Sequence, residues 1–424
     1  MKTAAPTSLS LERGRPPLTW LLLPFALGYG ASYFFRNVNA VAGPLLAREF
    51  GLDAGGLGFL TSAYFLTFAL AQVPLGIALD RYGPALVDSI MLTAAAAGAT
   101  LFACADSVVA LTLGRCLIGL GAGAALMSAM SAVHLWVGRD RAATAIGLIT
   151  TVGGIGALLA STPTRLMIDA LGWRQVFLLL GAVTALTAGL ALATGRHVRA
   201  AAGSEGLRQL LSGVRTVYSD RYFWLLSLPM MLTLGTMLAF QSLWAATWMR
   251  DVAGYTDGIA IGNVLFAFNL GLTAAFVSCG AIADALRARG VPHLTTFKAF
   301  CAIAFVAQAW LMWAPQTLPH LAWALMAFGA NALLLGYTLV AARFPQALTG
   351  RVNTSVNLLV FAGAFLMQSG IGAVVNLWPA TPGGYSQTGY YVAWIVLLAL
   401  QFAAWIVLVI HGRAADPGAT AGAR

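Results

Sequence analysis

The feature that most constrains this chain is a series of twelve long apolar stretches, each about long enough to cross a lipid bilayer. A spanning helix needs about 20 mostly apolar residues. The stretches lie at 18–46, 57–79, 84–104, 107–135, 142–165 and 173–194, and then at 222–249, 257–283, 292–314, 318–342, 351–376 and 389–411. They predict an all-α membrane protein whose twelve transmembrane helices form two groups of six.

The distribution of charge supports a membrane location. Only 9% of the 424 residues are charged, whereas soluble domains carry about 25%. The net charge of +10 does not indicate nucleic-acid binding, because the cations lie mainly in short loops. Placing the N-terminus in the cytoplasm assigns 17 of the 24 Lys and Arg residues to the cytoplasmic side and four to the opposite side, as the positive-inside rule requires. We therefore expect a monomeric, multi-pass protein of the bacterial inner membrane with both termini cytoplasmic.

A polar stretch divides the chain. We expect one six-helix half at 1–194, a cytoplasmic linker at 195–221 and a second half at 222–424. Within the linker, 207–217 alternates apolar and cationic residues at helical spacing. This segment is either an amphipathic helix on the lipid surface or a solvated connection.

The two halves repeat a short motif. The second stretch ends in "GIALDRYGPAL", from Gly76 to Leu86, and the eighth ends in "GAIADALRARG", from Gly280 to Gly290. Each places a glycine four residues before an aspartate, and Asp80 and Asp284 are 204 residues apart. Similar halves are a repeat signature of transporters.

These residues resemble the major facilitator superfamily over nearly the whole chain. The family's loop motif is Gly-x-x-x-Asp-Arg-x-Gly followed by basic residues, and the chain has Gly76, Asp80, Arg81 and Gly83 but then Pro84 and Ala85. The resemblance implies that this loop locks the inside gate. By the repeat, Asp284 and Arg287 are expected to play the matching part in the second half.

Features of the first and fourth stretches look like the anion-transporting branch of that family. "GRCLIGLGAGAA" matches the pattern Arg-x-x-x-Gly-x-Gly with Arg115, Gly119 and Gly121, but Ala122 stands where that branch often has a glutamate. "YFFRNVNAVAGPLLAREFGL" has Arg and Asn as that branch does. The fifth stretch lacks the late Gly-Pro typical of drug exporters.

Cations inside the apolar stretches are the strongest candidates for binding solute. Tyr29, Tyr33 and Arg36 share one helix face, Asn37 is adjacent, and Arg115 lies about two turns into the fourth helix. An arginine at a helix centre costs about 2.5–3.5 kcal/mol to insert, and its fork suits a carboxylate or phosphate. Arg36 and Arg115 are therefore expected to clamp an anion. The alternatives are a bond from Arg36 to backbone carbonyls and a helix-packing role for Arg115.

Polar side chains in the second half are further candidates. They are Gln241 and Trp244 in the seventh stretch, Asn331 in the tenth, and Asn357 and Gln368 in the eleventh. These groups either line the solute path or join one helix to another by hydrogen bonds.

No acidic residue lies clearly at the bilayer midplane. Asp88 is one turn into the third helix, Asp169 is near the opposite surface, and His134 is only a weak substitute. Protons are therefore a candidate coupling ion without an evident carboxylate site. The four cysteines and five histidines are scattered, so we expect no metal and no cofactor.

The chain is therefore interpreted as a secondary transporter, not an enzyme, that moves a small organic solute, expected to be anionic, by alternating access. An exporter of a metabolite or drug is one alternative. A polytopic membrane enzyme acting on lipid is another, and it would need a cluster of catalytic side chains that the scattered histidines do not form.

Overall fold

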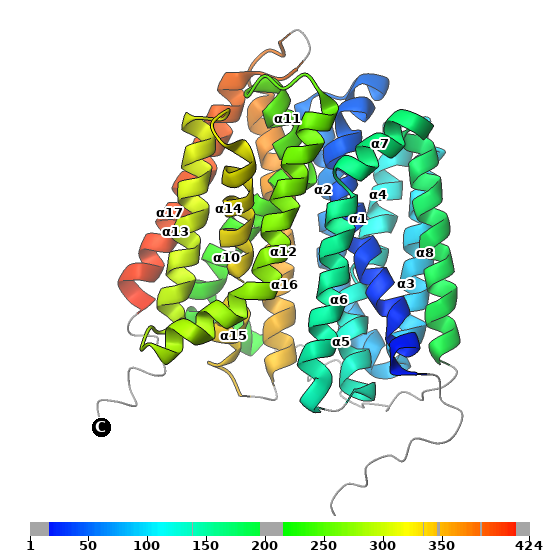
Figure 1. Cartoon of the computed structure of the whole chain (residues 1–424), viewed down its shortest axis with the longest axis vertical. Helices are drawn as coiled ribbons and strands as arrows, with labels where there is room; N and C mark the ends of the chain where they lie inside the picture. Colours follow the sequence, from blue (N-terminus) through cyan, green and yellow to red (C-terminus); the bar gives the residue numbers. More distant parts are fainter. Residues whose placement is uncertain are drawn as a thin grey trace, which may run out of the picture.

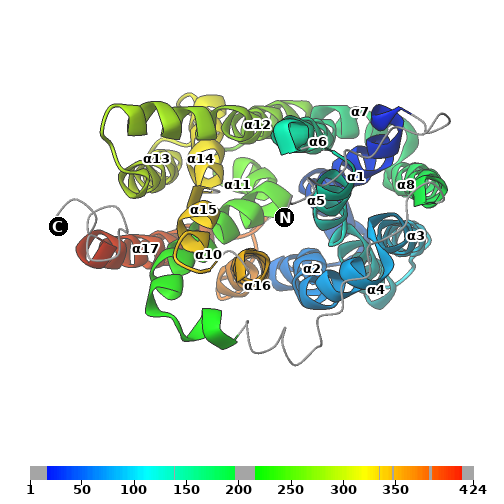
Figure 2. The same ribbon diagram turned by 90° about the horizontal axis from the view of Figure 1, so that it is seen from below.

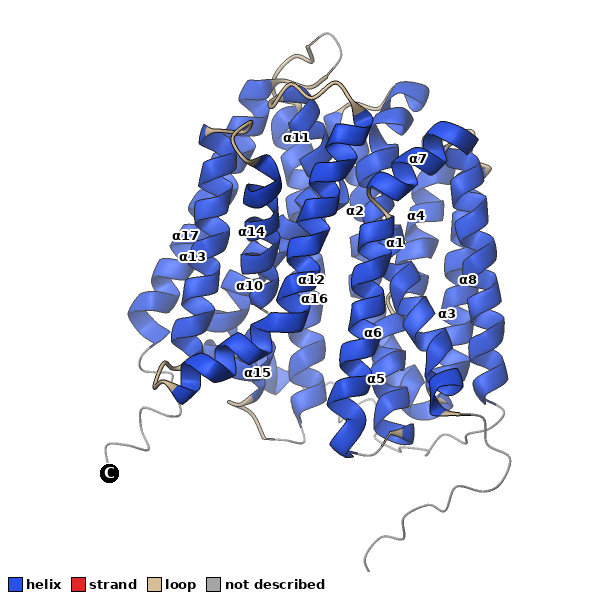
Figure 3. Ribbon diagram, in the orientation of Figure 1, coloured by secondary structure: helices blue, strands red, loops and turns tan. Residues whose placement is uncertain are grey.

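The computed structural model describes residues 17–137, 139–195, 215–333, 335–345, 348–381 and 384–412, without the side chains of 80, 139, 140 and 143. In the described part the chain is helical, and the one extended contact is an isolated bridge between Thr381 and Gly384 (Figure 3). Of the predicted linker 195–221, the structure describes 195 and 215–221, and residues 215–219 are helical. Residues 207–214 of the predicted amphipathic segment lie outside the described residues.

The helices run up and down between two ends of one bundle (Figure 1). Helix α1 begins and α17 ends near the bottom of Figure 1. We call this end of the bundle the lower end and the opposite end the upper end. The first group of helices is α1 (Leu18–Phe50), α2 (Ala54–Tyr82), α3 (Pro84–Ala103), α4 (Val108–Ala122), α5 (Ala125–Trp136), α6 (Arg139–Leu159), α7 (Thr162–Leu171) and α8 (Trp173–Gly195).

The second group follows residues 196–214. It consists of α10 (Arg221–Ala239), the π-helical turn η1 (Phe240–Trp244), α11 (Ala245–Asp251), α12 (Gly258–Ala288), α13 (His293–Trp313), α14 (Pro319–Ala332), α15 (Leu335–Ala341), α16 (Thr349–Val375) and α17 (Gln387–His411). In the described part, eleven helical spans are long and apolar enough to cross a membrane, and the bent pair α6–α7 makes a twelfth. The prediction of a twelve-helix membrane fold is confirmed.

Four of the predicted helices are interrupted. The fifth, predicted over 142–165, bends by 48° between α6 and α7. Pro163 lies in the first turn of α7, a position that proline tolerates, whereas it cannot lie inside a continuous helix without disrupting it. The fourth breaks at Gly123 and Ala124, the seventh contains the π-helical turn, and the tenth breaks between α14 and α15.

Side-chain caps and glycines explain where the helices begin and how closely they pack. Asp53 accepts a hydrogen bond from the Gly56 N–H at the start of α2, and Ser107 accepts one from Ala110 at the start of α4. Such caps satisfy N–H groups that have no partner within the helix. Helix α4 lies so close to α2 that a Cβ at Gly119 would collide with the backbone oxygen of Tyr64.

The two groups of helices meet along two seams. Helix α2 packs along α16, and α6 and α7 pack along α12, while α1 contacts η1 (Figure 2). Among the described side chains, those of α12 that hydrogen-bond across this seam are Asn263 and Asn269, both in the upper half of α12. Toward the lower end, a Cβ at Gly147 or Gly280 would meet no atom within 4 Å. The hydrogen bonds across this seam therefore lie on its upper part.

Candidate functional site

Arg36 lies near the middle of α1 and is almost completely buried, with 5% of its surface exposed. Its guanidinium carbon lies 4.4 Å from the ring centre of Tyr33, 5.0 Å from that of Phe361 and 5.6 Å from that of Phe68. The faces of aromatic rings attract cations, with about 2 kcal/mol for a desolvated pair. The rings therefore hold the cation without neutralising its charge.

Among the described side chains, no carboxylate compensates the charge of Arg36. In the part of the chain that the structure describes, three ion pairs occur, Arg165–Asp169, Arg174–Glu49 and Arg250–Asp251, and none involves Arg36. The Arg36 Nε atom is buried and has no hydrogen-bond partner. A buried charge is normally paired, so this guanidinium is suited to bind an anion from outside the chain.

The aromatic rings around Arg36 come from both groups of helices. Phe68 of α2 and Phe361 of α16 stack with their centroids 3.9 Å apart. Tyr33 of α1 lies edge-on to Phe276 of α12, with centroids 6.0 Å apart. Arg36 therefore rests on a surface to which the two halves contribute together, and any movement of one half against the other changes this surface.

Tyr29 and Asn37 lie beside this cation on α1. The rings of Tyr29 and Tyr33 meet edge to face at 5.1 Å, and only a glycine at position 153 leaves room for Tyr29, because a Cβ there would lie 2.6 Å from the ring. Asn37 is buried, and neither atom of its amide has a hydrogen-bond partner. The structure thus brings Tyr29, Tyr33 and Arg36 together as the spacing predicts.

Arg115 is also buried but makes a backbone contact. Its Nη1 donates to the carbonyl oxygen of Phe35 at 2.9 Å, and its guanidinium carbon lies 5.8 Å from the ring centres of Tyr64 and Phe102. This bond ties α4 to α1 at the residue directly before Arg36. The direct substrate role predicted for Arg115 stays a prediction. The hydrogen bond to Phe35 is the contact of a residue that positions α1.

Asn357 belongs to a chain of hydrogen bonds that crosses the α2–α16 seam. Its amide nitrogen donates to Gln72 Oε1 at 2.8 Å, and its amide oxygen accepts from the Tyr337 hydroxyl at 3.3 Å. Gln72 in turn donates to the backbone oxygen of Phe68 at 3.1 Å. These bonds lie one helical turn below the Phe68–Phe361 stack, so Asn357 joins the halves directly beside the Arg36 site.

Gln241 lies in the π-helical turn, which α1 contacts. Its amide nitrogen donates to Asn269 Oδ1 at 2.7 Å, and Asn269 donates to the backbone oxygen of Ala157 in α6 at 2.9 Å. The Gln241 Oε1 atom is buried without a partner. Because π-helical turns are frequent at functional sites, Gln241 remains a candidate that also helps to join the halves.

The other predicted residues of the second half make contacts within it. The Trp244 indole donates to the backbone oxygen of Gln368 at 3.0 Å, and the Gln368 side-chain amide donates to the Ser242 hydroxyl at 3.0 Å and to the backbone oxygen of Ala239 at 2.9 Å. Trp244 also lies against α2, because a Cβ at Gly58 would be 3.0 Å from its ring. Asn331 donates to the backbone oxygen of Ala327 at 3.3 Å and lies 3.9 Å from the Met237 sulfur. Their substrate roles stay predictions.

The residues predicted to form a gate lie at the lower end. Gly76 lies within α2, and Gly83 ends that helix with a φ of 78°. The Arg81 guanidinium lies 5.3 Å from the Tyr82 ring, whereas the side chain of Asp80 lies outside the described part. Asp284 and Arg287, near the end of α12, are exposed and form no ion pair with described side chains. The gating role of all six stays a prediction.

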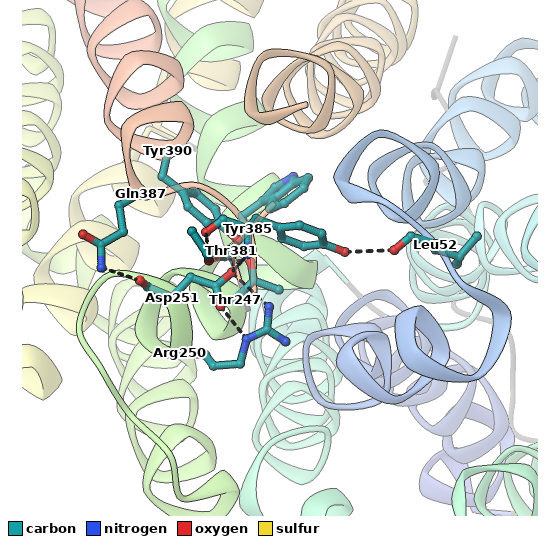
Figure 4. A network of polar contacts seen from close by, with 9 residues as sticks. Leu52, Thr247, Arg250, Asp251, Thr381, Tyr385, Gln387 and Tyr390 are labelled. Carbon is teal, nitrogen blue, oxygen red and sulfur yellow. Dashed lines mark hydrogen bonds and ion pairs between the residues drawn. The ribbon is translucent and has the colours of Figure 1, made fainter. Parts of the chain in front are cut away.

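A polar network lies at the upper end of the bundle and reaches from one half to the other (Figure 4). The Asp251 carboxylate binds the Arg250 guanidinium and accepts from the Tyr385 N–H at 3.1 Å and the Tyr390 hydroxyl at 3.0 Å. The Tyr385 hydroxyl donates to the Leu52 carbonyl at 3.3 Å, across to the first half. Burial raises the pKa of Tyr385 to about 12, so this hydroxyl keeps its proton.

Several of these residues carry no signal in the sequence. Phe68, Phe276 and Phe361 are ordinary members of apolar helices, and only the fold brings them to Arg36. The position of Asp88, one turn into the third helix, predicts that it lies near the membrane surface. In the structure it is fully buried, and neither of its oxygens has a hydrogen-bond partner among the described residues. In the described part no group of three or more His, Cys, Asp or Glu side chains could hold a metal ion.

Similar proteins include named transporters. The chain is 30% identical over 158 residues to the probable sulfoacetate transporter of Cupriavidus necator, and this aligned region covers 37% of each chain. It is 24% identical over 187 residues to the probable galactarate/D-glucarate transporter of Escherichia coli, covering 43% of this chain and 42% of that one. With the hexuronate transporter of Escherichia coli it shares 24% identity over 257 residues, or 56% of this chain and 59% of the relative. The chain thus aligns with about two fifths to three fifths of these relatives.

Solved structures resemble the fold over nearly its whole length. A bacterial homologue of the human lysosomal transporter Spinster, in an inward-facing and occupied conformation, superposes with a TM-score of 0.73 at 17% identity, covering 94% of this chain and 98% of that one. The nucleoside transporter NupG gives a TM-score of 0.71 at 15% identity, covering 92% and 99%. The family model described as Major Facilitator Superfamily matches residues 25–368. The chain therefore belongs to the Major Facilitator Superfamily.

Proposed function

We propose that this protein is a secondary transporter that moves a small organic anion across the membrane by alternating access. The observation that carries the proposal is Arg36, a buried cation that has no carboxylate partner among the described side chains and rests on rings from both halves. A carboxylate or sulfonate group would supply the missing negative charge. The names of the similar proteins, which concern sulfoacetate, glucarate and hexuronate, agree with this class of substrate.

In this proposal the guanidinium of Arg36 binds the anionic group through its planar fork. Tyr29, Tyr33 and Asn37 line the same stretch of α1, and the Asn37 amide offers both a donor and an acceptor that no protein group uses. Gln241 contributes its unused Oε1 from the second half. Arg115 acts indirectly, because its bond to the Phe35 carbonyl fixes the part of α1 that carries Arg36.

The seams between the halves support alternating access. Hydrogen bonds across them include Tyr385 to Leu52 and Thr162 to Asn263 at the upper end, whereas Gly147 and Gly280 have open space toward the lower end. With the lower end as the cytoplasmic one, this arrangement faces inward. A rocking movement would then break the upper contacts and bring the gate residues of α2 and α12, including Asp80 and Asp284, toward the opposite half.

Ligand-dependent stability of the purified protein tests the proposal. A ligand that binds only the folded protein raises its stability by about 2.7 kcal/mol at a hundred times its Kd. We expect at least one of sulfoacetate, D-glucarate and D-glucuronate to raise the melting temperature, and neutral analogues such as glucose to leave it unchanged. The same anion should exchange into proteoliposomes that contain the protein. Equal shifts for neutral and anionic analogues, or no exchange of any anion, would refute an anion site.

A further inference from the structure

A carboxylate lies buried inside the first half, away from the contacts used above. Asp88 is the fifth residue of α3, about 6 Å along the helix from Pro84 at 1.5 Å per residue. Its side chain is 0% exposed. It points at Gly28 of α1, because a Cβ there would lie 3.6 Å from Asp88 Oδ2. Ser128 of α5, also buried, is the neighbouring hydroxyl. Helices α1 and α5 thus cover the Asp88 carboxylate, although its position in the sequence predicts that it lies near the membrane surface.

Among the described residues, no charged group stabilises a negative charge on Asp88, and the Ser128 hydroxyl is a neutral polar neighbour. Both carboxylate oxygens lack a hydrogen-bond partner, and so does the Ser128 hydroxyl. Asp88 also lies beyond the first turn of α3, whose free N–H groups bind anions. None of the described charged side chains on the helices that pack against α3 forms an ion pair or hydrogen bond with Asp88. These side chains are Arg36, Arg48, Glu49, Arg81, Arg115, His134 and Arg174.

An isolated carboxylate in such surroundings binds a proton, because burying the charged form without a partner costs far more than burying the neutral acid. As a neutral acid, Asp88 can stay buried beside the Ser128 hydroxyl without a charged partner. Ionisation requires water or a cation, which can reach it only when α1 or α5 moves away from α3. The protonation of Asp88 is therefore tied to the packing of α1 against α3.

Helix α1 connects this carboxylate to the anion site. Gly28, which covers Asp88, and Arg36 lie eight residues apart on the same helix, about 12 Å at 1.5 Å per residue. A shift of α1 that follows anion binding at Arg36 therefore also changes the cover over Asp88. A glycine at position 28 allows the approach, since a Cβ there would lie 3.1 Å from Leu92 Cδ1.

We propose that Asp88 is the proton-binding site that couples anion transport to the proton gradient, a proposal that rests on the function proposed above. In the packed arrangement the Asp88 carboxylate has taken up one proton and formed an O–H bond. In the arrangement that opens the α1–α3 contact, the bond breaks and the proton leaves to water. One proton and one anion then cross together, with no oxidation or reduction.

Proton-driven accumulation in proteoliposomes tests the coupling, with sulfoacetate, D-glucarate and D-glucuronate as probes. At zero membrane potential a gradient of one pH unit is worth 1.36 kcal/mol, and supports up to about tenfold accumulation per coupled proton. We expect Asp88→Asn to exchange the anion normally when no pH gradient is present. With a gradient of one pH unit, the internal anion concentration in this variant should rise no higher than about the external one. Asp106→Asn, which alters an exposed aspartate between α3 and α4, should behave as the wild type.

Accumulation by Asp88→Asn equal to the wild type, or a parallel loss of exchange and accumulation in a well-folded variant, would overturn the proposal. Infrared spectroscopy of the protein without any solute gives an independent reading. The carbonyl band of a protonated carboxylic acid should be present near neutral pH in the wild type and absent in Asp88→Asn, and its absence from the wild type would also overturn the proposal. If the wild type exchanges no anion, the anion-transport function fails, and with it the coupling; the infrared band then reports only whether Asp88 binds a proton.

Discussion

Replacing Arg36 with glutamine separates a substrate-binding guanidinium from one that only holds the fold together. Insertion of an arginine at a helix centre costs about 2.5–3.5 kcal/mol, and contact with aromatic rings returns about 2 kcal/mol. Because Arg36 has no carboxylate partner in the part of the chain that the structure describes, its removal leaves no uncompensated charge behind there. We therefore expect Arg36→Gln to keep or slightly raise the melting temperature of the protein without substrate.

Affinity should change in the opposite direction. A hydrogen bond to a charged group contributes about 1.5–3 kcal/mol, so Arg36→Gln should weaken anion binding roughly tenfold to a hundredfold. Arg36→Lys keeps the charge without the planar fork and should give an intermediate loss. Binding and melting are measured on the same purified samples, with the anion that stabilises the wild type.

The control is Arg174→Gln. Arg174 is partly exposed and paired with Glu49, so its loss should cost at most about 1 kcal/mol of stability and leave the affinity unchanged. Unaltered affinity in folded Arg36→Gln would remove Arg36 from the site, and with it the reason for an anionic substrate. A sharp fall in the melting temperature would instead make Arg36 a structural residue.

Four further outcomes are expected. Gly119→Val should abolish folding, measured as the yield of monodisperse protein, because the side chain meets the Tyr64 carbonyl, whereas Gly147→Val, with open space around it, should be tolerated. Asp251→Asn should speed labelling of a cysteine placed at the upper end, because it weakens the bonds to Arg250 and Tyr390; unchanged labelling would show that the network does not hold this end closed. Asp80→Asn should slow transport while leaving the Kd unchanged, as expected for a gate, and normal transport rates would contradict that role. Reporter fusions at Gly203 and in the C-terminal tail should read as cytoplasmic and one at Gly383 as periplasmic; an external signal at Gly203 would reverse the orientation.

The sequence was sufficient for the helices because their length and apolar character are local properties. The bend at 160–161 was missed even though Pro163 is visible, since a proline near a helix end either kinks the helix or begins a new one. Arg36 was predictable because a cation in an apolar helix is conspicuous in any sequence. Its ring partners Phe68 and Phe361 were not, because phenylalanine in a membrane helix has no distinguishing pattern.

Burial of polar groups was the least predictable property. Counting residues from the start of α3 places Asp88 one turn from the surface, but α1 and α5 pack over it. Arg115 was recognised as a buried cation, whereas its partner, the Phe35 carbonyl, depends on how α4 crosses α1. Both contacts are set by the packing of helices that are distant in sequence, and neither leaves a local pattern.

The unpaired charge of Arg36 also determines where the membrane voltage can act. When a monoanion occupies the site, the loaded carrier has no net charge there and reorients without electrical work. In the empty carrier the anion no longer balances Arg36, but the Asp88 carboxylate that has released its proton offsets this charge, so the carrier as a whole also returns without electrical work. A carrier whose residue 88 cannot ionise, as in Asp88→Asn, would instead return with one positive charge, worth up to about 2.3 kcal/mol per 100 mV, and its unloaded return would be the electrically sensitive step of the cycle.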